Sequence, residues 1–171
     1  MSLIDIVDAQ RKAAQRLGFI SAAGSKRRPR SDKGRSRLPA PVATRLTRLL
    51  AREERPAMRA IRADLLAFCR EAGYRVPARA TLYSFMAKAP TRLYSSARLP
   101  VAAQAALYNL DSKARVPGHQ LAFYCFNYGD LAALCFAAGL PWLSLYQAAR
   151  MRGFRGKSRG LLEAVLRARG I

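Results

Sequence analysis

The stretch DLLAFCREAGYRVPARATLYSFM occupies residues 64–86 and decides the fold of the surrounding chain. Apolar residues recur at helical spacing in its first and last parts, and a glycine and a proline lie between them. Gly73 can adopt the positive φ angle that ends a helix, so the stretch predicts a helix, a turn and a second helix. The inner face of the first helix is expected to contain Leu65, Leu66, Phe68 and Cys69. The second helix is expected to be anchored by Val76, Leu82, Phe85 and Met86.

The part VPARATLYSFM resembles the turn and recognition helix of helix-turn-helix DNA-binding regulators, over a motif of about 25 residues. The resemblance implies that a helix over residues 78–89 enters the major groove of duplex DNA. It implies base contacts from Arg79, Thr81 and Ser84. Phosphate or sugar contacts are implied for Tyr83 and Lys88. Independently of the resemblance, the apolar anchors leave five polar residues for the exposed side: Arg75, Arg79, Thr81, Ser84 and Lys88.

A second, similar unit follows later in the chain. DLAALCFAAG, at residues 130–139, matches DLLAFCREAG at six of ten positions, and a Leu-Tyr pair recurs after each. Trp142 and Leu143 would take the groove-facing positions of this unit. Because apolar side chains read base edges poorly, we interpret it as structural or as a self-association surface, with a second DNA-binding unit as the alternative.

The charge of the chain is the main indication of a partner. The net charge is +21, and 25 of the 31 basic residues are arginine. An excess this large repels itself in a folded monomer, and a polyanion relieves the repulsion. We therefore expect nucleic acid as the partner, DNA before RNA, and a homodimer stays open. Two alternative explanations of this charge are a ribosome-like basic protein and a GC-rich genome that raises the arginine content.

The basic residues fall in separate segments. Residues 3–17 predict an amphipathic helix, whereas residues 21–37 hold no large apolar side chain and predict a disordered basic arm. The arm is expected to lie along phosphates through Lys26, Arg27, Arg28, Arg30, Arg35 and Arg37. A flexible basic loop at residues 150–159 is expected to do the same through Arg150, Arg152, Arg155, Lys157 and Arg159. A solvated linker and a solvated turn are the alternatives for these two segments.

The most apolar stretch is residues 121–149, which carry one charge, that of Asp130. Gly129 and the Gly-Leu-Pro at residues 139–141 divide it into three predicted helices. Residues 131–149 are long enough to suggest a membrane span, but the break at residues 139–141 favours a buried helix pair.

The remaining segments complete a mostly α fold. We expect helices at residues 42–53, from Pro56 to residue 72, and at residues 100–110 and 158–169, the last exposing Arg167 and Arg169. Residues 91–99 predict at most a short hairpin or wing, and residues 112–118 a loop. The expected organisation is an N-terminal helix (1–20), the basic arm (21–38), a helix-turn-helix domain (39–115) and a C-terminal helical subdomain (116–171).

Enzyme chemistry has little support in the sequence. There is one histidine, His119, and no phosphate-binding loop, nucleophile elbow or metalloprotease motif. Cys69, Cys125 and Cys135 are expected to be buried reduced thiols, and no metal or cofactor is expected. The first residues lack the pattern of a signal peptide, which predicts a cytoplasmic protein.

The function expected from the sequence is therefore binding without chemistry. We expect a sequence-specific duplex-DNA-binding transcriptional regulator, and by analogy one of the antitoxin or mobile-element kind. The alternatives are an RNA-binding or ribosome-associated basic protein and a helical protein-interaction module.

Overall fold

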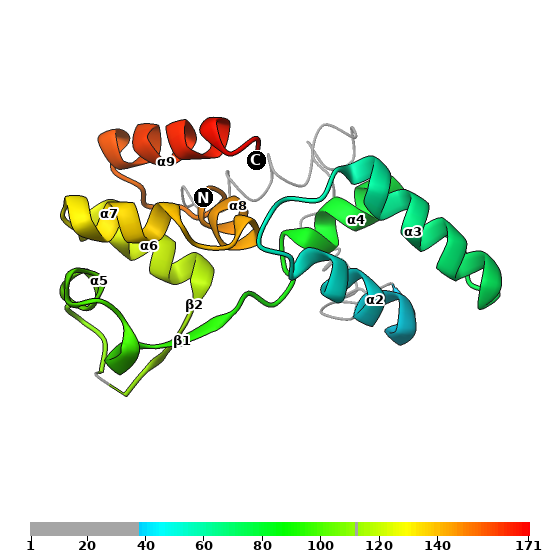
Figure 1. The fold of residues 1–171 in the computed structure, drawn as a ribbon, viewed down its shortest axis with the longest axis horizontal. Helices are drawn as coiled ribbons and strands as arrows, with labels where there is room; N and C mark the ends of the chain where they lie inside the picture. The colour runs from blue at the N-terminus through cyan, green and yellow to red at the C-terminus, as the bar shows by residue number, and fades with distance from the viewer. Residues whose placement is uncertain (1–37, 112) are drawn as a thin grey trace, which may run out of the picture. The chain divides into compact units, whose positions relative to one another are not determined.

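The structure is a computed structural model that describes residues 38–111 and 113–171. These residues form eight α-helices and two short strands, which confirms the mostly α fold (Figure 1). The expected N-terminal helix and basic arm lie outside the described residues. So do the candidate phosphate contacts at Lys26, Arg27, Arg28, Arg30, Arg35 and Arg37.

Helices α2 (Ala40–Leu50) and α3 (Met58–Glu71) form because their apolar residues share one face. Pro41 lies in the first turn of α2. Backbone N–H groups in a first turn have no acceptor within the helix, so the N–H that proline lacks costs no hydrogen bond there. The buried residues are Val42, Leu46, Leu49 and Leu50 in α2, and Ile61, Leu65 and Cys69 in α3. With Leu82, Met86 and Ala89 from α4 (Arg79–Met86) and its end, and with Trp142 and Leu143, they form what we call the α2–α4 core. Two expectations were wrong: Pro56 precedes α3 rather than opening it, and Leu66 is exposed.

Gly73 ends α3 as expected, with a φ of 69°. The backbone N–H of Tyr74 donates to the carbonyl of Cys69 at 2.8 Å, which is the hydrogen bond of a Schellman motif. The ring of Tyr74 then lies 6.4 Å from that of Phe68, which supplies the apolar contact that accompanies this motif. The helix-turn-helix order is therefore present, followed by α4 (Arg79–Met86), but the turn between α3 and α4 is longer than a compact one.

The two strands differ from the local hairpin that the sequence predicts. β1 (Leu93–Ser95) continues into the 3-10 turn Ser96–Arg98, and it pairs antiparallel with β2 (Arg115–Pro117), which was expected to be loop. Tyr94 lies opposite Val116 in the register. α5 (Val101–Ala106) lies between the strands in sequence, so the pair closes a long loop rather than a tight hairpin.

The apolar stretch divides into three helices, as predicted: α6 (Gly118–Tyr128), α7 (Leu131–Ala138) and α8 (Trp142–Ala148). Asp130 caps α7, its carboxylate accepting from the N–H of Ala133 at 2.8 Å. α6 packs against α7, α8 and α9 (Gly156–Ala168). A side chain at Gly118 would collide with Ser144 and Tyr94, so the glycine allows α6 and α8 to approach closely.

These helices surround what we call the α5–α9 core, whose buried residues are Leu99, Ala103, Ala106, Leu107, Val116, Leu121, Ala122, Cys125, Phe126, Ala133, Ala137, Leu140, Leu145, Ala148 and Leu162. Within the described part of the chain, no single helix is both long and apolar enough to cross a membrane. α7 and α8 meet the length and composition criteria together, but they bend by 117° at the break.

α8 joins the two cores. Trp142 and Leu143, at its start, are buried with α2, α3 and α4, whereas Leu145 and Ala148 are buried in the α5–α9 core. Gln147 donates 2.8 Å hydrogen bonds to the carbonyls of Met86 and Ala89, just after α4. α8 is therefore enclosed, which fits the structural interpretation of the second helix-turn-helix-like unit.

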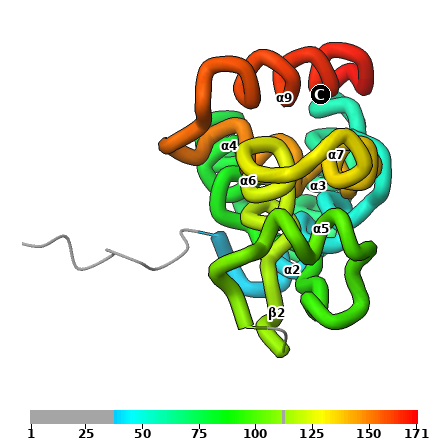
Figure 2. Tube along the Cα trace, turned by 90° about the vertical axis from the view of Figure 1, so that its left-hand side faces the viewer, coloured from blue at the N-terminus to red at the C-terminus, as the bar shows by residue number. Residues whose placement is uncertain are grey.

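The C-terminal helix and the chain end also fasten the fold. Arg167 is exposed, but Arg169 was wrongly expected to be: its guanidinium donates to the carbonyls of Ala138 and Leu140 at 2.8 and 2.6 Å. It thereby satisfies carbonyls at the end of α7. Arg55 donates to the carbonyl of Gly170 at 3.2 Å, and Figure 2 shows the C-terminus beside this segment before α3.

Candidate nucleic-acid interface

The described residues carry 21 basic and seven acidic side chains, so most cations have no carboxylate available. Two ion pairs form among residues 38–111 and 113–171: Arg45 with Asp64 at 2.7 Å and Arg159 with Glu163 at 3.3 Å. The Arg45 guanidinium makes both of its bonds to one carboxylate and holds the pKa of Asp64 below its usual value. Most of the other basic side chains are exposed.

Most of the residues for which the resemblance to helix-turn-helix regulators implies nucleic-acid contacts are exposed on α4 or near its ends. Arg79 and Ser84 are exposed, and Lys88 and Arg75 are exposed just outside the helix ends. Arg79 donates to the Tyr83 hydroxyl at 3.3 Å and its guanidinium lies 5.6 Å from that ring centre. This hydrogen bond lowers the pKa of Tyr83, and the ring holds Arg79 against the helix surface.

Thr81 is half-buried, which differs from the expected exposed position. It lies one residue before the buried Leu82 and one turn before the half-buried Phe85, at the edge of the face that packs on the α2–α4 core. Its side chain is therefore less available for a base contact than Arg79 or Ser84.

The sequence analysis missed a row of arginines on α3. Arg59, Arg62 and Arg70 are exposed on the helix that buries Ile61, Leu65 and Cys69. The signal was available, because residues at i, i+3 and i+11 fall near one face of an α-helix. These arginines are further exposed cations on the helix that precedes α4.

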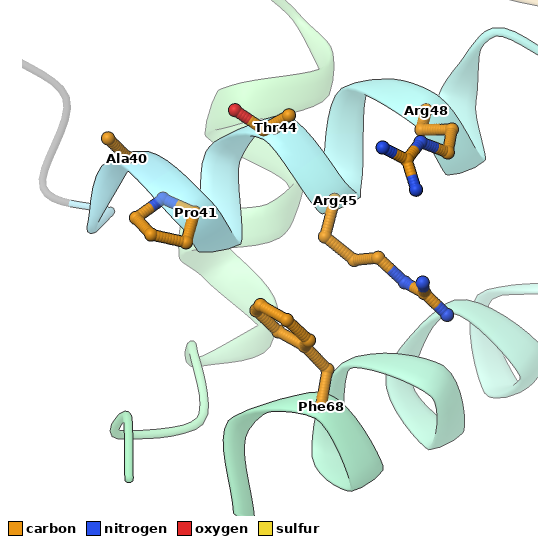
Figure 3. A pocket seen from close by; sticks show the side chains of 6 residues that line it. All are labelled: Ala40, Pro41, Thr44, Arg45, Arg48 and Phe68. Atoms are coloured by element: carbon orange, nitrogen blue, oxygen red, sulfur yellow. The ribbon is translucent and has the colours of Figure 1, made fainter. Parts of the chain in front are cut away.

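A shallow hollow lies where α2 meets α3 (Figure 3). Its volume is about 440 Å³, and it is lined by Ala40, Pro41, Thr44, Arg45, Arg48 and Phe68. Arg45 runs from α2 toward α3 and lies 5.9 Å from the Phe68 ring centre, while both of its bonds go to Asp64. Arg48 is exposed, so it is the lining arginine that could contact a ligand in this hollow without breaking an ion pair.

The basic loop before α9 is anchored, which differs from the flexible loop expected. The buried Asn127 accepts from the N–H of Arg155 at 3.1 Å and donates to the carbonyl of Gly153 at 3.4 Å. Phe154 packs 4.8 Å from the Phe123 ring centre and is half-buried in the α5–α9 core. The loop thus presents its cations from a held backbone.

These cations divide between two places. Arg150 donates to the Tyr146 hydroxyl at 2.8 Å, and the half-buried Tyr146 packs on the α2–α4 core. Arg155 instead lies 4.9 Å from the ring centre of Tyr128, on the α5–α9 core. Arg152 is exposed in the loop, whereas Lys157 and Arg159 are exposed in the first turn of α9, because this helix begins at Gly156 and so takes in the end of the predicted loop. Arg150 therefore lies against α8 and Arg155 against the end of α6, while Lys157 and Arg159 belong to α9.

The remaining reactive groups are accounted for by packing. His119 contacts the Thr91 hydroxyl at 2.9 Å, and burial lowers its pKa. Cys69 and Cys125 are buried as expected, and burial raises the pKa of Cys125 to about 12, but Cys135 is exposed. No group of three His, Cys, Asp or Glu side chains among the described residues could hold a metal ion.

Comparison with protein-family models finds no match for this chain, and comparisons with curated proteins and with solved structures find none either. A functional assignment therefore rests on the chemistry of the residues described above.

Proposed function

We propose that this chain binds nucleic acid, with duplex DNA as its first target, through α3, α4 and the turn between them. One observation carries the proposal. Six cations on α3, on the turn, on α4 or just after α4 are exposed and have no carboxylate partner among the described residues: Arg59, Arg62, Arg70, Arg75, Arg79 and Lys88. A phosphate backbone supplies the missing counter-charge, and released counterions supply much of the binding free energy.

α4 is the helix proposed to read base edges. Its eight residues span about 12 Å, enough to face three or four base pairs. Arg79, in its first turn, can form two hydrogen bonds to a guanine, and Ser84 can contact either base of a pair. In helix-turn-helix proteins it is the N-terminal part of the recognition helix that meets the bases, which is where Arg79 lies.

The arginines of α3 and the residues around α4 are proposed to contact phosphate. Arg59, Arg62 and Arg70 would fix the position of the chain on the duplex without reading sequence. The basic arm at residues 26–37 is proposed to add contacts of the same kind. Site-specific duplex binding would suit a transcriptional regulator, a role that rests on analogy.

Selection from a random pool of duplexes tests the proposed reading helix. The full-length chain should enrich one sequence, and Arg79→Ala and Ser84→Ala should each broaden that preference. The matched control is Arg98→Ala, which removes an exposed arginine from the turn after β1. An unchanged preference in both α4 variants would rule out groove reading by this helix.

A further inference from the structure

Two exposed tyrosines lie together at one edge of the α5–α9 core. Tyr108, just after α5, is 70% exposed, and Tyr128, the last residue of α6, is 40% exposed. Their ring centres are 5.6 Å apart at an interplanar angle of 78°. The two rings together form an exposed aromatic surface on which a partner can pack.

The rings rest on a supported base. Tyr124 lies 5.9 Å from Tyr128, and Phe123, next in the series, packs against Tyr124 and the half-buried Phe154. The aromatic series therefore continues from solvent into the α5–α9 core. A ring held in this way loses little conformational freedom when a ligand stacks on it.

Arg155 adds a second flat group to this edge. Its guanidinium lies 4.9 Å from the ring centre of Tyr128, and its backbone is held by the side chain of the buried Asn127. Arg152 and Lys157, on either side of it, are exposed and have no carboxylate partner among the described residues. Residues 152–157 thus supply one planar guanidinium, which lies against Tyr128, and two exposed cations.

We propose that Tyr108, Tyr128 and Arg155 form a stacking site for unpaired bases of a single-stranded nucleic acid, separate from the duplex site on α3 and α4. Aromatic rings and guanidinium planes stack on bases of any identity, and neighbouring cations follow the phosphates. Bases inside a duplex cannot reach such a site, because their faces are already covered. The proposal shares with the proposed function the premise that the partner is nucleic acid.

The test measures binding of two fluorescein-labelled nucleic acids to the full-length chain, by anisotropy at one fixed salt concentration. One is a 12-nucleotide single strand that forms no hairpin, and the other is a duplex. Tyr108→Ala should weaken single-strand binding about tenfold and leave duplex binding unchanged. Tyr108→Phe keeps the ring and should bind like the original chain. Val101→Ala removes another exposed apolar side chain from α5 and should change neither affinity.

A second variant separates stacking from charge. Arg155→Lys keeps the positive charge but loses the planar group, so it should also weaken single-strand binding while preserving the salt dependence. Arg79→Ala should weaken duplex binding alone, so failure at either site can be told from failure at the other. Unchanged single-strand affinity in Tyr108→Ala and Arg155→Lys overturns the proposal. So does an equal loss on both nucleic acids, or a change of oligomeric state in Tyr108→Ala at the concentrations used.

Discussion

The side-chain amide of Gln147 donates a 2.8 Å hydrogen bond to the carbonyl of Met86, 61 residues earlier in the chain. The same nitrogen donates to the carbonyl of Ala89, so one buried amide satisfies two carbonyls at the end of α4. This relationship fastens the proposed reading helix to α8. It also shows why α8, despite its resemblance to a second recognition helix, is committed to holding the fold together.

Gln147→Ala should lower the free energy of unfolding by about 1–3 kcal/mol, because two buried carbonyls lose their partner. Urea unfolding followed by circular dichroism measures the change. Gln120→Ala is the matched control, since Gln120 is exposed on α6, and it should stay within about 0.5 kcal/mol of the original. Equal stability of the two variants would contradict the role assigned to Gln147.

Much of the helical fold could be predicted because its signals are local. The four-residue spacing of Val42 and Leu46 indicated a helix face, and Gly73 and Gly129 marked helix ends, as observed. The pairing of β1 with β2 could not be predicted in this way. Each strand has three residues, too few to show alternation, and α5 separates the two strands in the chain.

Trp142 and Leu131 belong to the same apolar stretch but have opposite environments, fully buried and 75% exposed. Trp142→Ala should cost about 3–5 kcal/mol of unfolding free energy, because it empties the place where α8 meets the α2–α4 core. Leu131→Ala should cost less than about 0.5 kcal/mol. Thermal and urea unfolding of both variants check this difference, and comparable losses would contradict the burial of α8.

Arg169 and Arg167 form a second contrasting pair. Arg169→Ala should destabilise the chain by about 1.5–3 kcal/mol, because a charged donor leaves the carbonyls of Ala138 and Leu140. Arg167→Ala removes an exposed side chain and should leave stability nearly unchanged. Calorimetric melting of both variants is the measurement. A stable Arg169→Ala chain would mean that water replaces the guanidinium at the end of α7.

The candidate site illustrates the same limit of local reasoning. Helical period alone placed Arg79 and Ser84 on the exposed side correctly, and it would have placed Arg59, Arg62 and Arg70 there too. It could not foresee Arg169, whose carbonyl partners lie 29 and 31 residues away, nor that Asn127 fixes the basic loop. Those outcomes depend on tertiary contacts that no sequence window contains.

The free energy of unfolding should depend on pH because of His119. Burial lowers its pKa below 6.5, so the unfolded chain binds the proton more readily than the folded one. Stability should therefore fall as the pH drops through 6.5 and below. His119 is the only histidine, so His119→Gln should flatten this slope between about pH 7 and 5.5. The measurement is the denaturant midpoint of unfolding as a function of pH. If the midpoint of His119→Gln falls with pH as steeply as that of the original chain, other groups cause the pH dependence.

Duplex DNA affinity as a function of salt concentration tests the central claim most directly. If the chain neutralises about six phosphates, the logarithm of the binding constant should fall against the logarithm of salt with a slope of about −5. Removing Arg59, Arg62 and Arg70 together should make the slope shallower by about 2.7, whatever the sequence of the duplex. A slope near zero, or no measurable duplex binding at low salt, would contradict the account.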